Sequence, residues 1–270
     1  MNTEVIAFAH QSLEEGTPVA LAILIESGRD TPGVPGGMMA VRADGNRLGT
    51  VGGGAAEAKI IQDCKKALGD RDSTVVPFDY SLQEEGGLGM MCGGEIKGII
   101  TVLRPARRLI IFGGGHVGQK LYEAGLTAGF SVTVVEDRPE YAEIFPKAET
   151  VIAQDFGTAA QSLSIHEESY IVIVTRGHVQ DYAVLSAVIE TNAAYIGMIG
   201  SRGKVAGLIQ KLRDQGISQE RIDSLYTPIG LDIDNGAPGE IAIAVLAEII
   251  AVKNNGRLRH CRDRVKTSDR

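Results

Sequence analysis

Residues 107–139, RRLIIFGGGHVGQKLYEAGLTAGFSVTVVEDRP, decide the fold of this chain. A short apolar run at 109–112 leads into a cluster of glycines, after which apolar residues recur at helical spacing. A second run, at 132–135, is rich in β-branched residues and ends on Glu136 and Asp137. The pattern predicts strand, tight turn, helix and strand, the first βαβ unit of a dinucleotide-binding sheet.

Three glycines of the turn have separate expected roles. Gly113 permits a sharp turn, Gly115 lets backbone amides approach a phosphate, and Gly118 lets the helix lie close to the strand. Such folds hold a ribose hydroxyl with an acid about 20 residues further on, where Glu136 or Asp137 stands. Because 34 of the 270 residues are glycine, the spacing alone arises easily by chance, and its place between strand and helix carries the inference. The alternative is a Rossmann-like scaffold with a degenerate site.

Composition favours a cytoplasmic globular protein. A formal net charge of −7 and a pI near 5.3 argue against nucleic acid or an anionic membrane as the main partner. No apolar run approaches the roughly 18 residues that a membrane span needs, and the acidic start does not resemble a secretory leader. The cysteines at 64, 92 and 261 lack metal-ligand spacing, so we expect a reducing compartment.

The alternation of strands and helices continues to the end of the chain. Strands are expected at 150–153, 170–174 and 195–199, and helices at 179–190, 202–214 and 238–252. Ser201 stands where it would cap the second of these helices, and Pro238 suits the first turn of the last. The last helix is apolar on nearly every side and should be buried. Residues 105–270 are therefore predicted to form a Rossmann-like α/β domain with a parallel sheet.

Ligands gather beyond the carboxyl ends of parallel strands, so the residues there are the candidates for binding. They are Gly113, Gly114, Gly115, His116, Val117 and Gly118 after the first strand, Glu136, Asp137 and Arg138 after the second, Thr175, Arg176, His178 and Asp181 after the fourth, and Gly200, Ser201, Arg202 and Lys204 after the fifth. His178 and Asp181 are spaced to orient one another at a helix start. Cationic and amide donors suit an anionic ligand such as a pyrophosphate. For each residue alone, the alternative is a cap or a surface polar group.

The first 104 residues predict a smaller, glycine-rich α+β domain. Helices are expected at 3–15 and 55–68, and strands at 19–25, 39–42, 47–51, 75–80 and 96–103. Asp44-Gly45 is a hairpin signal. Cys64 shares an apolar helix face and should be a core residue.

Two glycine loops of this first domain suit close approach to a ligand's polar groups, with tight turns as the alternative. One contains Gly52, Gly53 and Gly54, and the other surrounds Cys92. Cys92 is either a thiolate that contacts a metal or carries sulfur, or an ordinary buried residue.

Several motifs, in their order along the chain, resemble those of the xanthine dehydrogenase accessory factor (XdhC/CoxI) family. They are TVGGGAAE from residue 50, GLGMMCGGE from 87, GGGHVGQKL from 113, VVEDRPEY from 134, TRGHVQDYAVL from 175, AYIGMIGSRGK from 194, and TPIGLDI from 227 followed by PGEIAIAVLAEIIAV from 238. The resemblance covers nearly the whole chain.

The resemblance implies a maturation factor for molybdenum hydroxylases. Such a factor binds molybdenum cofactor, helps it acquire a sulfido ligand through a cysteine desulfurase, and delivers it to the hydroxylase apoenzyme. The resemblance also places both glycine loops on the cofactor-facing surface, and it implies that the turn at 113–118 grips a pyrophosphate of a pterin or of NAD(P). Gly54 stands where some relatives carry a cysteine, and Gly33-Val34 stands where a basic residue commonly precedes Pro35-Gly36. The residues therefore support cofactor binding better than sulfuration.

Motifs of catalysis are missing from the sequence. There is no Walker lysine motif, no His-x-x-x-His, no Cys-x-x-Cys and no nucleophile-elbow serine. We therefore predict an accessory protein rather than an enzyme, and expect a homodimer. The alternatives are an NAD(P)-dependent oxidoreductase and a nucleotide-sensing regulator.

Overall fold

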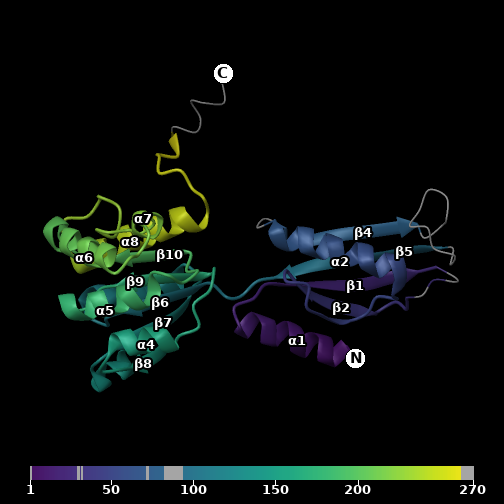
Figure 1. Ribbon diagram of the computed structural model, residues 1–270, viewed down its shortest axis with the longest axis horizontal. Helices are drawn as coiled ribbons and strands as arrows, with labels where there is room; N and C mark the ends of the chain where they lie inside the picture. Colours follow the sequence, from purple (N-terminus) through teal and green to yellow (C-terminus); the bar gives the residue numbers. More distant parts are fainter. Residues whose placement is uncertain (1, 29–30, 32, 71–72, 82–93, 263–270) are drawn as a thin grey trace. The chain divides into compact units, whose positions relative to one another are not determined.

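The computed structural model describes residues 2–28, 31, 33–70, 73–81 and 94–262. The chain divides into two compact units, residues 1–105 and 106–270 (Figure 1). Each unit contains its own five-stranded sheet. Within the described residues, no helix combines the length and the apolar character needed to cross a membrane.

The N-terminal unit is an antiparallel sheet between two helices. Its elements are α1 (Asn2–Glu14), β1 (Val19–Ser27), β2 (Met38–Arg42), β3 (Arg47–Gly49), α2 (Gly54–Gly69), β4 (Val75–Ser81) and β5 (Glu95–Leu103), with strand order β3-β2-β1-β5-β4. The predicted hairpin joins β2 and β3, and Gly45 in its turn has φ +94°. Alternate residues of β1 and β2 face opposite sides of the sheet, so α1 and α2 bury separate apolar clusters.

The C-terminal unit is a parallel sheet, which confirms the predicted fold class. Its strands are β6 (Arg108–Phe112), β7 (Ser131–Glu136), β8 (Glu149–Ile152), β9 (Ser169–Ile173) and β10 (Tyr195–Met198), in the order β10-β9-β6-β7-β8. Its helices are α3 (His116–Thr127), the 3-10 helix η1 (Pro139–Ile144), α4 (Phe156–Ser162), α5 (His178–Val188), α6 (Arg202–Asp214), α7 (Gln219–Asp223) and α8 (Pro238–Lys253).

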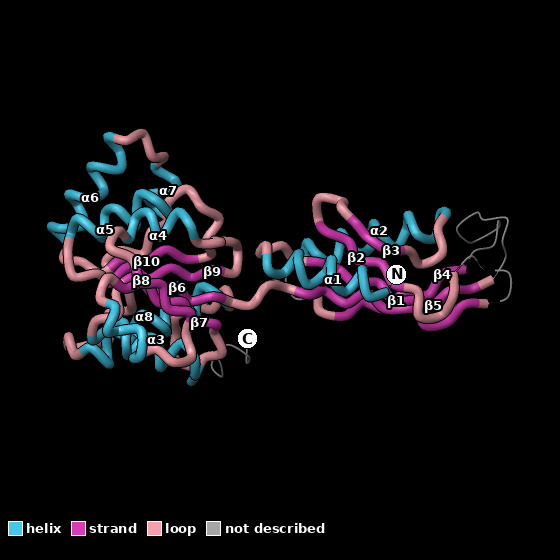
Figure 2. The backbone as a smooth tube through the Cα atoms, turned by 90° about the horizontal axis from the view of Figure 1, so that it is seen from below, coloured by secondary structure: helices cyan, strands magenta, loops and turns pink. Residues whose placement is uncertain are grey.

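Helices cover both faces of this parallel sheet. Helices α3 and α8 lie on one face, and α4, α5 and α6 lie on the other (Figure 2). The strands are accordingly apolar along their whole length, as β6 and β9 show with buried residues at nearly every position. Because β6 begins the unit and lies between β7 and β9, the chain order reverses beside it. That reversal opens a crevice at the carboxyl ends of β6 and β9.

Two local predictions need correction, and one helix was missed. Helix α8 begins at Pro238 as expected, but it is not buried all round, because the side chain of Ile243 is 60% exposed. Ser201 occupies the N-cap position of α6, yet its side chain makes no capping hydrogen bond. Helix α4 was not predicted at all, although Asp155 caps it by accepting a hydrogen bond from the Thr158 amide at 2.8 Å.

Cys64 is fully buried among apolar residues of α2 and the sheet, which confirms its predicted place in the core. Burial, together with the Asp63 carboxylate, raises the pKa of its thiol to about 12. The thiol therefore stays neutral and unreactive at pH 7. In a Cys92→Ser variant, maleimide should modify the exposed Cys261 rapidly and Cys64 only after unfolding, as read by peptide mass spectrometry. Equal labelling rates in the native protein would contradict this assignment.

Candidate functional site

Two glycines of the turn after β6 are required by the fold itself. Gly113 has φ +110°, and a Cβ there would lie 2.5 Å from the carbonyl oxygen of Val174. At Gly118 a Cβ would lie 2.0 Å from the carbonyl oxygen of Gly113. The first glycine allows the sharp turn, and the second allows α3 to approach β6 closely.

Neither backbone conformation nor packing requires the glycine at position 115. Gly115 has φ −66°, which suits any residue, and a Cβ built on it meets no atom within 4 Å. Gly177, after β9, has φ −152° and is equally open. Both glycines line a cavity of about 270 Å³ at the crevice. Because neither glycine has a side chain, a ligand in this cavity can come close to the backbone at both positions.

Glu136 lies at the centre of the polar network. Its side chain is 2% exposed, and its carboxylate accepts hydrogen bonds from the amides of Gly114 (2.7 Å), Asp137 (3.0 Å) and Arg138 (3.2 Å). The Arg138 guanidinium donates two more, at 2.8 and 2.9 Å. Burial alone would raise the pKa of this carboxyl, but the hydrogen bonds from Arg138, Asp137 and Gly114 outweigh it and lower the pKa to about 2.

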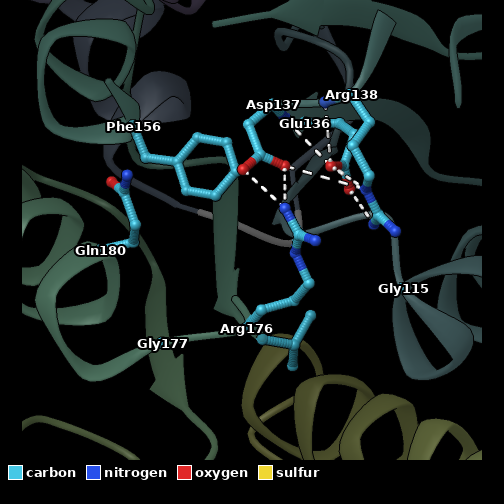
Figure 3. A pocket seen from close by; sticks show the side chains of 10 residues that line it. Gly115, Glu136, Asp137, Arg138, Phe156, Arg176, Gly177 and Gln180 are labelled. Carbon is cyan, nitrogen blue, oxygen red and sulfur yellow. Dashed lines mark hydrogen bonds and ion pairs between the residues drawn. The ribbon is translucent and has the colours of Figure 1, made fainter. Parts of the chain in front are cut away.

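Two arginines flank the cavity, and each is held by a carboxylate. Arg138 pairs with Glu136, and its guanidinium lies 3.5 Å from the centre of the Tyr141 ring. Arg176 comes from the loop after β9 and donates from Nη2 to both carboxylate oxygens of Asp137, at 2.9 and 2.8 Å (Figure 3). The arginines arise from different strand ends and place two guanidinium groups at the cavity, and the carboxylates of Glu136 and Asp137 balance their charge.

A second cavity, of about 420 Å³, shares Gly115, Arg138, Val174 and Arg176 with the first. It extends over the first residues of α3 and α8, and its other lining residues are His116, Val117, Tyr141, Thr175, Ile199, Gly236, Pro238 and Ile241. The crevice thus has two compartments that meet at the two arginines. A ligand with two ends joined by phosphate would suit this arrangement.

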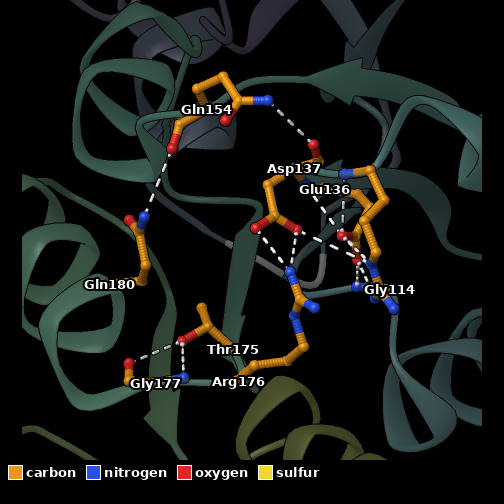
Figure 4. Close-up of polar contacts among 9 residues, drawn as sticks. Gly114, Glu136, Asp137, Gln154, Thr175, Arg176, Gly177 and Gln180 are labelled. Carbon is orange, nitrogen blue, oxygen red and sulfur yellow. Dashed lines mark hydrogen bonds and ion pairs between the residues drawn. The ribbon is translucent and has the colours of Figure 1, made fainter.

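Asp181 anchors the loop rather than lining the crevice. It is fully buried and accepts a hydrogen bond from the Thr175 hydroxyl at 2.6 Å, which ties the end of β9 to α5. The Thr175 hydroxyl also contacts the backbone of Gly177, at 3.1 Å from its carbonyl oxygen (Figure 4). His178 begins α5 and is exposed, as is His116 at the start of α3. Gly200 and Ser201 follow β10 and line neither cavity. The side chains of Arg202 and Lys204 lie outside the described parts of the chain.

The predicted glycine loop that contains Gly52, Gly53 and Gly54 belongs to the N-terminal unit. Gly52, Gly53 and Gly54 all have positive φ, from +66° to +125°. The Glu57 carboxylate accepts hydrogen bonds from the Val51 amide at 3.2 Å and the Gly53 amide at 3.1 Å. Part of this loop's donor capacity is therefore used within the unit. Cys92 and its loop lie outside the described residues.

Sequence reasoning missed several residues that line the crevice. Phe156 and Gln180 line the first cavity, and Tyr141 and Gly236 line the second. Phe156 was missed because α4 was not recognised. Tyr141 had a usable signal, since it follows Arg138 by three residues, the spacing at which a guanidinium can stack on a ring.

The fold and the crevice define a two-unit α/β protein whose Rossmann-type half has a crevice lined by glycines and two arginines. The chain belongs to the XdhC and CoxI family: the family model for the XdhC Rossmann domain matches residues 109–249, and the model for the XdhC and CoxI family matches residues 12–79.

Individual relatives agree with this membership. The Escherichia coli K12 protein named uncharacterized protein YqeB is 35% identical over 245 residues, covering 90% of this chain and 45% of YqeB. This chain therefore spans about half the length of that relative. The E. coli K12 molybdenum cofactor insertion chaperone PaoD is 23% identical to this chain, and the match covers 92% of this chain and 88% of PaoD. A crystal structure titled as a xanthine dehydrogenase from Bacillus halodurans shares the fold, with a TM-score of 0.50 and 20% identity over 94% of this chain and 96% of that one.

Proposed function

We propose that this protein is a cytoplasmic accessory factor that binds molybdenum cofactor and delivers it to a xanthine dehydrogenase-type hydroxylase. The observation that carries the proposal is the open space at Gly115, a glycine that the fold does not require, between two cavities and beside two arginines. Membership of the XdhC and CoxI family supports it. PaoD, a relative named as a molybdenum cofactor insertion chaperone, supports it as well.

The crevice fits the phosphate of a pterin cofactor in three respects. No atom lies within 4 Å of a Cβ built at Gly115, so an oxyanion can approach the amides at the start of α3. The guanidinium groups of Arg138 and Arg176 offer planar donors that match phosphate geometry. The second compartment adds apolar surface at Pro238 and Ile241 for a flat ring system. The cofactor would be cargo here, so its molybdenum chemistry belongs to the recipient enzyme.

Sulfuration and assembly are further parts of the proposal. We assign transfer of sulfur to a cysteine desulfurase partner, as the family resemblance implies. Cys64, which is buried with a raised thiol pKa, is not placed to carry the sulfur. A homodimer is the assembly that we propose for delivery. The recipient would be a molybdenum hydroxylase apoenzyme, as the family resemblance implies.

The proposal is tested by the pterin content of protein purified from cells that make the cofactor. Pterin released from the wild type should be detected by its fluorescence after oxidation. A Gly115→Val variant should carry at least about tenfold less, because the branched side chain enters both cavities and a loss of about 1.4 kcal/mol in binding is tenfold.

The matched control is Gly207→Ala on α6, where a Cβ also meets nothing within 4 Å and which lines neither of the two cavities. This control should keep the wild-type pterin content, and both variants should keep the wild-type circular dichroism spectrum. Equal pterin in the Gly115→Val variant and the wild type would count against the site.

A second candidate function is an NAD(P)-dependent oxidoreductase, favoured by the β6–α3–β7 unit with acids at the end of β7. Calorimetric titration with NAD⁺ and NADP⁺, followed by hydride-transfer assays on purines and aldehydes, separates the two functions. Dinucleotide binding with turnover would favour the oxidoreductase. Absence of turnover would favour the accessory factor.

A further inference from the structure

We propose that the groove between α3 and α8 is the surface through which two copies of this chain pair about a twofold axis. The inference rests on the proposed function, because it names the face that the homodimer proposed there would use. The groove has a volume of about 460 Å³ and is lined by α3, by Ala128 directly after it, and by α8. The two helices lie side by side on one face of the parallel sheet (Figure 2).

Both helices turn one side toward the groove. The lining residues recur at helical spacing, and they are Lys120, Glu123, Ala124 and Thr127 on α3, and Gly239, Ile243 and Leu246 on α8. Residues three and four apart share one side of a helix. The groove is therefore a continuous surface formed by two regular helices, and not a gap left by an irregular loop.

The groove and the apolar side chain beside it have complementary shapes. Small residues line the groove at Ala124, Ala128 and Gly239, and a Cβ built on Gly239 meets no atom within 4 Å. Ile243 is 60% exposed, whereas Leu246, one turn further along α8, is only 8% exposed. A recess and an exposed apolar side chain on the same surface become complementary about a twofold axis, because the Ile243 of each copy then enters the recess of the other.

The charges at the groove favour a second copy over a protein of one charge sign. Within the described residues, Lys120 and Glu123 are the charged residues that line it, and their side chains are 53% and 59% exposed. In one copy they pair with each other, with 2.9 Å between Lys120 Nζ and Glu123 Oε2. One cation and one anion cancel, so the groove has no net charge that would select an acidic or a basic protein. About a twofold axis, Lys120 of each copy can meet Glu123 of the other, which gives two ion pairs across the interface.

The groove adjoins the crevice but shares no lining residue with it. Pro238 lines the second cavity, and the next residue, Gly239, lines the groove. Helix α3 likewise lines the second cavity at His116 and the groove from Lys120 onwards. Pairing through the groove would therefore fix the two helices whose first residues line the crevice, and it would leave the crevice of each copy accessible.

The first test is sedimentation equilibrium of the full chain over a range of concentrations. The wild type should be a dimer. Ile243→Asp should weaken the dimer by at least about a hundredfold, because a charge replaces a buried apolar side chain at two places related by the axis. Val179→Asp is the matched control, since Val179 is 82% exposed on α5, which covers the opposite face of the sheet. The control should remain a dimer, and both variants should keep the wild-type circular dichroism spectrum.

The second test exchanges the charges between copies. Lys120→Glu and Glu123→Lys should each weaken the homodimer, because like charges would then face one another across the axis. In an equimolar mixture, the two variants should form a heterodimer about tenfold more stable than either homodimer, because opposite charges meet again. Native mass spectrometry reads the species when one variant carries a heavy-nitrogen label.

A monomeric wild type would overturn the inference, whether another protein or the chain's own N-terminal unit then covers the groove. A dimer equally strong in Ile243→Asp and Val179→Asp would overturn it as well, as would charge variants that form no excess of heterodimer. A monomer that still carries pterin would overturn the inference and leave cofactor binding standing. A dimer that depends on Ile243, in a protein that never carries pterin, would support the inference and count against the proposed function.

Discussion

Replacing Glu136 with glutamine should lower the free energy of unfolding of the C-terminal unit by about 3 kcal/mol at pH 7. Removing one partner of a buried, hydrogen-bonded ion pair costs about 3–5 kcal/mol, and the low end applies because the Arg138 side chain remains 21% exposed. The glutamine amide group would also face donors at Gly114 and Arg138. Loss of these hydrogen bonds would also loosen the turn that contains Gly115.

The same carboxylate gives a pH dependence with a defined sign. Its pKa in the folded protein is lowered to about 2 from an ordinary value of 4.5. The contribution of Glu136 to stability is therefore fully present above pH 4.5 and is lost as the pH falls towards 2. The free energy of unfolding of the wild type should fall between pH 4.5 and about 2, and that of Glu136→Gln should fall less over the same range.

The measurement is urea denaturation followed by circular dichroism, because the chain has no tryptophan. Amide hydrogen exchange of peptides from β6 and β7 assigns the change to the C-terminal unit. Glu123→Gln is the matched control, since the Glu123 side chain is 59% exposed and forms an ion pair with Lys120 on the surface of α3. A loss of less than about 1 kcal/mol in Glu136→Gln would show that the network contributes no more than an exposed pair.

Replacing Gly118 with alanine should lower the free energy of unfolding of the same unit by about 3 kcal/mol or more. The added Cβ would lie 2.0 Å from the carbonyl oxygen of Gly113, and both atoms belong to rigid parts of the backbone. Relief requires moving α3 away from β6, which opens the core beneath the helix. Leu121 and Tyr122 would lose part of their burial.

Thermal and urea unfolding of Gly118→Ala should be compared with Gly207→Ala, whose new Cβ meets open space in an exposed helix. The control should be neutral or more stable by up to about 1 kcal/mol, since alanine favours helix over glycine. Equal stability of the two variants would mean that α3 does not lie as close to β6 as described.

The elements of the parallel sheet were predictable because buried parallel strands are continuous apolar runs, as at β6 and β9. Helix α4 was not predicted because the helix is too short for a helical period of apolar residues to appear in the sequence. Helix α8 was predicted to be buried on every side because Ile243 extends its apolar surface, and sequence does not show which face lacks a neighbour.

The candidate site was predictable only as a set of strand ends. The sequence shows two acids after β7 but not that Arg138, two residues beyond Glu136, folds back onto it. Nor does it show that Asp181 turns inward to Thr175, because a buried aspartate and an exposed one look alike in a helix start. Hydrogen bonds between loops are set by tertiary geometry, which local spacing does not encode.

The most direct test of the account is a crystal structure of the wild-type protein purified from cells that synthesise molybdenum cofactor. The account predicts density for a phosphate group within hydrogen-bond distance of the backbone at Gly115. Cofactor bound only to residues 1–105, with the crevice empty, would contradict it.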